Sequence, residues 1–290
     1  MKPSVDKTIH ELLNKFLSKL EDHFESDLFS YFGPMVDGQE NTILKLLEEL
    51  AVEKKSKRLT IFLTSTGGSA LAVERFVNII RSLYDEIYFV VPDYAYSAGT
   101  IFCMSGDKIF MDYFSVLGPI DPQVQNKDGK WVPALGYLDK INELIEKAQN
   151  NTLTNAEFLI LKDFDLAELR GYEQARELTF SLLKKWLVKY KFKNWKKHRT
   201  NKEKLGQKVA KKEKMERAEE IAKKLSDNNL WKSHSRPINI ETLKSELRLE
   251  IEDYSEEKEL RQDIRSYYDL LSDYVKRTQS TIFIHTRKFI

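Results

Sequence analysis

The sequence predicts an α/β fold with a mostly parallel sheet, and three observations support this prediction. Between residues 28 and 124, short runs rich in β-branched and aromatic residues alternate with segments whose apolar residues recur at helical spacing. Residues 58–64 form a short, largely apolar run, which is typical of a strand buried on both faces of a parallel sheet. Turns of small residues join the strands to the helices that follow. This order favours right-handed βαβ units.

Each element follows from its local pattern. A helix is expected at 4–24, where Ile9, Leu13 and Leu20 share one stripe, and Gly33 with Pro34 ends the first strand. The expected strands are 28–34, 58–64, 86–91, 108–111 and 281–285. The other expected helices are 42–52, 70–83, 98–105, 134–149, 154–190, 215–225, 241–247 and 255–276, with a loop at 231–238.

The composition bounds the class of protein. A chain of 290 residues with 41% hydrophobic and 32% charged residues has room for one large domain with appendages. The single cysteine, Cys103, excludes an intrachain disulfide framework and a Cys-rich zinc site, and we expect it to be buried. The chain has no apolar run of about 18 residues and no signal-peptide core, so we expect a soluble, cytoplasmic protein with no membrane span.

Metal and nucleotide chemistry are not expected. No two of the five histidines have metal-ligand spacing, and no Gly-rich phosphate loop occurs. The sequence therefore predicts no metal, no cofactor and an activity that does not depend on ATP hydrolysis by this chain.

Two turns share an arrangement that favours acyl transfer. Residues 65–69 (Ser-Thr-Gly-Gly-Ser) and 96–100 (Tyr-Ser-Ala-Gly-Thr) each follow a predicted strand and open a predicted helix, so both are expected at the carboxyl edge of the sheet. Ser97 would lie at a helix N-terminus, which favours an oxyanion, while Gly67 and Gly68 let backbone N–H groups approach a substrate. The alternative is structural, since serine often caps helices and Gly-Gly often forms turns.

The order of these motifs resembles a known family. The segments 64–70 and 96–100 are followed by 117–123 (Leu-Gly-Pro-Ile-Asp-Pro-Gln) and preceded by 31–34 (Tyr-Phe-Gly-Pro). Together they resemble the serine dehydrogenase-type proteinases, which are relatives of signal peptide peptidase A and the Clp proteolytic subunit. The resemblance covers about 28–124 closely and is weaker at 153–186 and 231–238.

The resemblance implies a Clp/crotonase-like fold and a serine endopeptidase. Ser97 takes the nucleophile's place, and Gly68 with the N–H of Ala98 takes the place of the oxyanion hole, beside Gly67. The expected substrate is a peptide or an unfolded protein, cleaved through an acyl-enzyme. Proteins of this fold generally assemble as rings or trimers, so a homo-oligomer is expected.

The expected organisation has three parts. They are an N-terminal helix at 1–27, a peptidase domain at 28–250 with a helical, basic insertion at about 134–214, and a C-terminal helix and strand at 251–290.

The general base is left open by the sequence. Pro119 falls near the place of the Clp subunit's catalytic histidine and cannot titrate. His234 with Asp121 forms one candidate pair. The ordinary pKa of a histidine is already close to neutral pH, so the protein needs to shift it little for the side chain to act as a base. Lys147 falls roughly where signal peptide peptidase A has its base, and Lys162 is a second possible lysine. A lysine base must be desolvated to lower its pKa towards neutrality. We rank His234 with Asp121 slightly above Lys147.

A strongly basic segment spans 184–214. Fifteen of its positions are Lys, Arg or His, only Glu203 and Glu213 oppose them, and four aromatic residues interleave at its start: Trp186, Tyr190, Phe192 and Trp195. Such a run can bind nucleic acid or another acidic partner through phosphate contacts and base stacking. The alternative is a solvated lid over a peptide groove.

Two further functions remain as alternatives. A crotonase-type acyl-CoA enzyme would use the same oxyanion hole without needing Ser97. A non-catalytic relative would serve in assembly or would bind nucleic acid through the basic segment.

Overall fold

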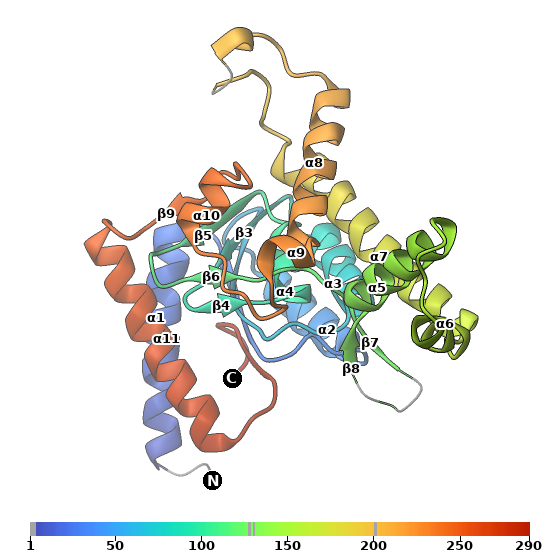
Figure 1. Cartoon of the computed structure of the whole chain (residues 1–290). Helices are drawn as coiled ribbons and strands as arrows, with labels where there is room; N and C mark the ends of the chain where they lie inside the picture. The colour runs from blue at the N-terminus through green and yellow to red at the C-terminus, as the bar shows by residue number, and fades with distance from the viewer. Residues whose placement is uncertain (1–3, 127–128, 130, 200–201) are drawn as a thin grey trace.

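A six-stranded sheet lies at the centre of the computed structural model, which describes residues 4–126, 129, 131–199 and 202–290 (Figure 1). The strand order is β10-β1-β2-β3-β5-β9, and all neighbours are parallel except β1 and β10. The bounds are β1 Asp27–Phe32, β2 Arg58–Thr64, β3 Glu86–Val90, β5 Lys108–Met111, β9 Glu252–Asp253 and β10 Phe283–His285. The predicted α/β class with a mostly parallel sheet is confirmed.

Helices cover both faces of this sheet. Because side chains alternate along a strand, Ile61 and Leu63 of β2 pack into a core with α2, α3 and α4, whereas Phe62 packs into the opposite core with α1 and α11. The helix bounds are α1 Ser4–Phe24, α2 Glu40–Val52, α3 Ala70–Leu83, α4 Ala98–Cys103 and α11 Lys258–Thr278. Cys103 is fully buried, as expected, and burial raises the pKa of its thiol.

The middle of the chain forms a helical region beside the sheet (Figure 1). Its helices are α5 Ala134–Gln149, α6 Asn155–Lys162, α7 Leu166–Trp186, α8 Lys211–Leu225, α9 Asn228–Trp231 and α10 Ile240–Ser245, with a π-helix at Leu187–Lys191 and a 3₁₀ turn at Lys202–Lys204. The prediction of one helix over 154–190 is wrong, because Asp165 caps a new helix by accepting the Ala167 N–H at 2.7 Å.

The two ends of the chain pack together. Helices α1 and α11 lie side by side on one face of the sheet, and β10 pairs with β1 (Figure 1). Beyond β10, the Arg287 guanidinium contacts the buried carboxylates of Glu21 at 2.7 Å and Asp27 at 2.6 Å. The segments 4–27 and 251–290, although distant in sequence, therefore meet on the sheet.

His285 joins three of these elements. Its Nδ1 accepts from the Tyr267 hydroxyl of α11 at 2.8 Å, and its Nε2–H donates to Asn14 Oδ1 of α1 at 3.1 Å. Burial lowers the pKa of His285 from 6.5 to about 3, so the ring is neutral in the folded protein.

We expect His285 to make the fold sensitive to acid. Because its pKa is lower in the folded than in the unfolded state, its contribution to stability is present above pH 6.5 and is lost as pH falls towards 3. Between about pH 7 and about pH 5 the wild type should lose about 2 kcal/mol more unfolding free energy than His285→Gln. Denaturant titrations measure this difference. His23→Gln, which alters an exposed histidine, should behave as wild type, and equal acid losses in all three proteins would contradict the expectation.

Candidate active site

The two predicted turns meet at the carboxyl edge of the sheet. The Ser65 N–H donates to Tyr94 O at 3.1 Å, and the Tyr96 N–H donates to Ser65 O at 2.9 Å. Gly67 and Ser97 pack tightly, since a Cβ added at Gly67 would lie 2.8 Å from Ser97 Cβ. Two segments about 30 residues apart in sequence are therefore joined at this edge, as the strand-to-helix pattern predicted.

Ser97 has an unusual backbone conformation. Its φ is 51° and its ψ is −115°, a sparsely populated combination for a residue with a side chain. The turn lies between the short strand β4 (Tyr94–Ala95) and α4, and the Ser97 side chain caps no N–H of that helix. A strained strand-to-helix turn of this kind presents a nucleophilic hydroxyl away from the backbone. Ser97 is half-buried.

The Gly67–Gly68 turn is held by Met35. The Met35 N–H donates to Gly67 O at 2.8 Å, and the Ser69 N–H donates to Met35 O at 2.8 Å. Gly68 has a φ of +138°, and a Cβ there would lie only 2.1 Å from Met35 O, so the position has no room for a side chain.

Two backbone donors remain open near Ser97. Within the described residues, the Gly68 N–H donates no hydrogen bond. The Ala98 N–H is the first of α4 and has no carbonyl of its own helix to bond. Open backbone N–H groups close to a nucleophilic hydroxyl are the donors that an oxyanion hole needs.

Sequence reasoning missed two positioning residues. Ser65 Oγ accepts the Gly67 N–H at 3.1 Å, so this buried side chain shapes the glycine turn. Thr100 Oγ1 lies 2.8 Å from Ala95 O, to which it donates, and accepts the Gly118 N–H at 3.0 Å. Both residues belong to the two turns from which the acyl-transfer site is predicted. A polar side chain within a turn of small residues could have identified them, because such side chains often hydrogen-bond the turn backbone.

His234 lies on a segment that reaches this edge. Four residues after it, Ile238 pairs with Leu117 through two backbone hydrogen bonds of 3.0 and 2.8 Å. Leu117 ends β6 (Val116–Leu117), which is parallel to the strand leading into Ser97. His234 is half-buried, and its Nδ1 is a buried atom with no hydrogen-bond partner among the described residues. Burial lowers the pKa of His234, so the imidazole is neutral near pH 7 and able to accept a proton.

The other candidate bases have different surroundings. Asp121 is fully buried and accepts the Leu135 N–H at 3.2 Å. Lys147 Nζ contacts Glu157 at 2.6 Å and Glu143 at 3.0 Å, and these partners raise its pKa. Lys147 is therefore held protonated, whereas a general base must be neutral. Lys162 is exposed at the end of α6.

The Ser97 hydroxyl forms no side-chain hydrogen bond within the described part of the chain, so neither His234 nor Lys147 contacts it directly. Catalytic hydrogen bonds are often long or absent before substrate binds. Over the same described residues, no group of three or more metal-ligating side chains occurs, and no helix is both long and apolar enough to cross a membrane.

Comparison with protein families defines the class. A family model described as the ClpP-like SDH-type serine proteinase matches residues 39–206, which is more than half of the chain and includes both turns. The chain therefore belongs to this family of serine proteinases.

Relatives of this chain are found in an archaeon. Two uncharacterized proteins of Methanocaldococcus jannaschii, MJ0137 and MJ1495, are each 27% identical to it over 209 and 207 residues. The matches cover 72% and 71% of this chain, which spans only 58% and 56% of the relatives' own lengths.

Solved structures with partial likeness include two mutant forms of 1510-N, a membrane-bound stomatin-specific protease. Their TM-scores are 0.32, with 18% and 20% identity, and the second form is bound to a substrate peptide. The matches cover 41% and 49% of this chain and 60% and 69% of those chains.

Proposed function

We propose that this protein cleaves peptide bonds through an acyl-enzyme formed on Ser97. The strained backbone of Ser97 carries this proposal, because a residue is held at φ 51° and ψ −115° only when its surroundings impose that conformation. Membership of a serine proteinase family supports the same reaction class. The strain also argues against an acyl-CoA enzyme, which would not need a serine in this conformation.

In the proposed mechanism, Ser97 Oγ attacks the carbonyl carbon of the scissile peptide. The base removes the hydroxyl proton, and the N–H groups of Gly68 and Ala98 bind the oxygen of the tetrahedral intermediate. The base then returns the proton to the leaving amine, and water hydrolyses the ester that remains on Ser97.

We assign the base to His234. The segment that carries it is paired through Ile238 to the strand next to the Ser97 turn, and burial keeps the ring neutral. Lys147 is the weaker candidate, because two carboxylates hold it in its charged form. Asp121 would orient the imidazole if substrate binding brings the two side chains together.

The proposed substrate class rests on the shape of the Gly67–Gly68 turn at the carboxyl edge of the sheet. Gly68 is exposed and has no side chain that would obstruct an extended chain. We therefore propose peptides and unfolded proteins as substrates.

A fluorophosphonate probe tests this proposal. The wild type should be labelled at one serine, and peptide mapping by mass spectrometry should place the label on Ser97. Ser97→Ala should lose labelling completely, whereas Ser235→Ala, which alters an exposed serine of the 231–238 segment, should be labelled as wild type. A label on another serine, or equal labelling of the Ser97→Ala protein, would overturn the assignment.

A further inference from the structure

Part of the basic segment forms an ordered arm that projects from the body of the protein. We define the basic arm as the described residues 193–199 and 202–214, which extend away from the sheet at the top of Figure 1. Two stretches of the arm run antiparallel: the His198 N–H donates to Gln207 O at 3.0 Å, and the Val209 N–H donates to Lys196 O at 3.0 Å. Backbone hydrogen bonds therefore hold the stretch around Lys197 against the stretch around Lys208.

Packed aromatic side chains hold the base of the arm. The Trp195 ring makes edge contacts with Phe192 at 5.6 Å and with His198 at 5.7 Å between ring centroids. Phe192 and Trp186 are buried, and Trp195 packs against the main core. These aromatic residues are occupied inside the protein, so they do not offer the base-stacking surface that the sequence had indicated.

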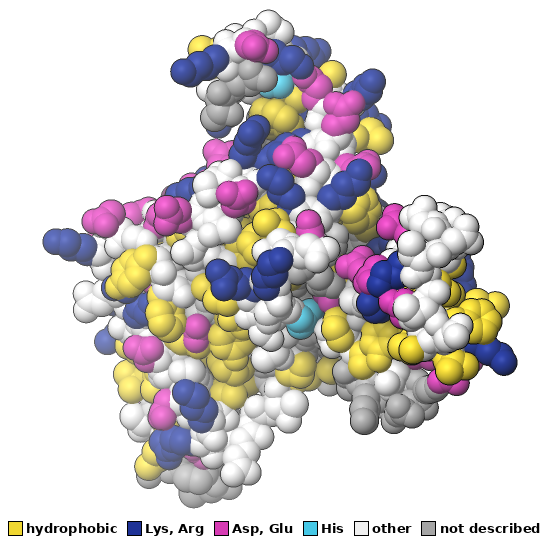
Figure 2. Space-filling view, viewed as in Figure 1, with side chains coloured by type: hydrophobic (Ala, Val, Ile, Leu, Met, Phe, Trp, Pro, Cys, Tyr) yellow, Lys and Arg dark blue, Asp and Glu magenta, His cyan; other side chains and the backbone are white. Residues whose placement is uncertain are grey.

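The arm concentrates positive charge. It contains ten Lys and Arg residues and two Glu residues, a net charge of +8, while the whole chain carries +2, so the remainder carries −6. Lys197 and Lys208 are cross-strand partners, which places two like charges on one face. Lys196, Lys197, Lys208 and Lys211 are exposed and form no ion pair with any described residue. Figure 2 shows Lys and Arg side chains gathered on this projection.

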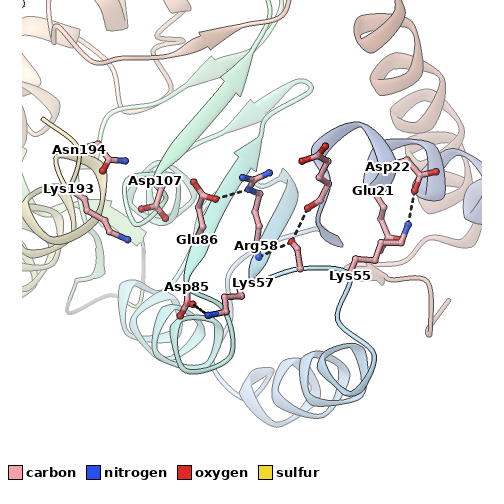
Figure 3. Close-up of a pocket in the computed structure, with 12 residues that line it drawn as sticks. Glu21, Asp22, Lys55, Lys57, Arg58, Asp85, Glu86, Asp107, Lys193 and Asn194 are labelled. Atoms are coloured by element: carbon pink, nitrogen blue, oxygen red, sulfur yellow. Dashed lines mark hydrogen bonds and ion pairs between the residues drawn. The ribbon is translucent and has the colours of Figure 1, made fainter.

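The arm does not cover the candidate active site. Lys193 and Asn194, at its base, line a pocket of about 750 Å³ together with Arg58, Glu86 and Asp107, as Figure 3 shows. Arg58 and Glu86 are the first residues of β2 and β3, so this pocket lies at the amino ends of the strands. Ser97 lies at the carboxyl ends. The alternative of a lid over the peptide groove is therefore disfavoured, and the arm has room to contact a separate partner.

The exposed surface of the arm favours nucleic acid over a protein partner. Protein–protein interfaces are depleted in Lys at their core and are anchored by aromatic and other apolar side chains. The large apolar side chains exposed on or next to the described arm are Leu205 and Met215, whereas lysines dominate it. The surfaces with which proteins bind DNA are much more positively charged than those with which they bind other proteins. A lysine ammonium is a point charge that contacts phosphate without reading a base edge.

We propose that the basic arm binds the phosphate backbone of double-stranded nucleic acid without sequence selectivity. Phosphates on a duplex supply the dense negative charge that relieves the repulsion between Lys197 and Lys208. This role is separate from catalysis at Ser97, and it would place the proteinase on nucleic acid with its active site facing away.

Fluorescence anisotropy with a labelled DNA duplex of arbitrary sequence tests the proposal. The arm variant replaces Lys196, Lys197, Lys208 and Lys211 by Gln. The matched control makes the same change at four exposed lysines of the body, Lys15, Lys45, Lys258 and Lys276, and so has the same net charge. Affinities are compared between about 50 and about 200 mM salt, and the thermal midpoint of each protein verifies its fold.

The wild type and the control should bind with similar affinity. The arm variant should bind at least about tenfold more weakly, and its slope of log K against log salt should be smaller in magnitude by about 3 to 4. Equal binding by the arm variant and the control would overturn the proposal, as would a preference for single strands. Arm-dependent self-association or capture of polyglutamate, without duplex binding, would instead identify a protein partner and also reject it.

Discussion

Replacing His234 by alanine is expected to lower kcat for peptide cleavage about as much as replacing Ser97, by about 10⁴- to 10⁶-fold, and the double variant should be no slower than either single one. The reason is that a nucleophile and its base act as one unit, so removing either leaves only binding and the oxyanion donors. The neutral imidazole and the strained serine turn motivate this expectation. Initial rates on an unstructured fluorogenic peptide measure all three variants.

The pH profile gives a second readout of the same assignment. Because burial lowers the pKa of His234, the group loses its proton below the ordinary histidine range. In the wild type kcat/KM should therefore rise with pH through a pKa below 6.5 and stay level above it.

Lys147→Ala provides the control for the base. It removes the ion pairs with Glu143 and Glu157 and should leave kcat and the pH profile close to wild type. A crippled Lys147→Ala protein together with an active His234→Ala protein would reverse the assignment. Near-wild-type rates in both would direct attention to Lys162.

Gly68→Ala should lower kcat by about 10²- to 10³-fold. A Cβ at this position would lie 2.1 Å from Met35 O, so the turn must move and withdraw the N–H that we propose as an oxyanion donor. Because the proposed donor would contact charge that develops only in the transition state, KM should change much less than kcat. Steady-state kinetics on the same peptide separate the two constants.

Gly38→Ala is the matched control for this change. Gly38 also has a positive φ, +95°, but nothing lies within 4 Å of a Cβ built there. Both variants carry backbone strain, and only Gly68→Ala disturbs the site. A Gly68→Ala protein that folds and cleaves at the wild-type rate would remove Gly68 from the mechanism.

Local patterns predicted most of the elements around the site. Helix α3 at 70–83 and strand β2 at 58–64 have the bounds that their spacing and apolar content indicated. The meeting of the two small-residue turns also followed, because the carboxyl ends of neighbouring parallel strands share one edge. Each of these patterns spans only a few residues, so it can be interpreted without knowing how the rest of the chain folds.

The surroundings of the candidate bases were not predictable in the same way. Lys147 and Glu157 meet because α5 and α6 form a short helical pair, and that contact decides the charge of the lysine. His234 is neutral because neighbouring segments bury it. A pKa depends on what packs around a group, which its neighbours in sequence do not reveal.

The sequence by itself determined the α/β class, the alternation of the main strands and helices between residues 28 and 111, and the two turns that carry Ser97 and Gly68. Only the tertiary structure decided that α1 packs on α11, that β10 pairs with β1, and that the base of the basic arm lies away from the candidate active-site edge. The physical reason is the distance along the chain over which each kind of interaction acts. Periodicity and turn chemistry act between near neighbours in the chain, whereas the contacts between its two ends arise only when distant apolar faces are buried together.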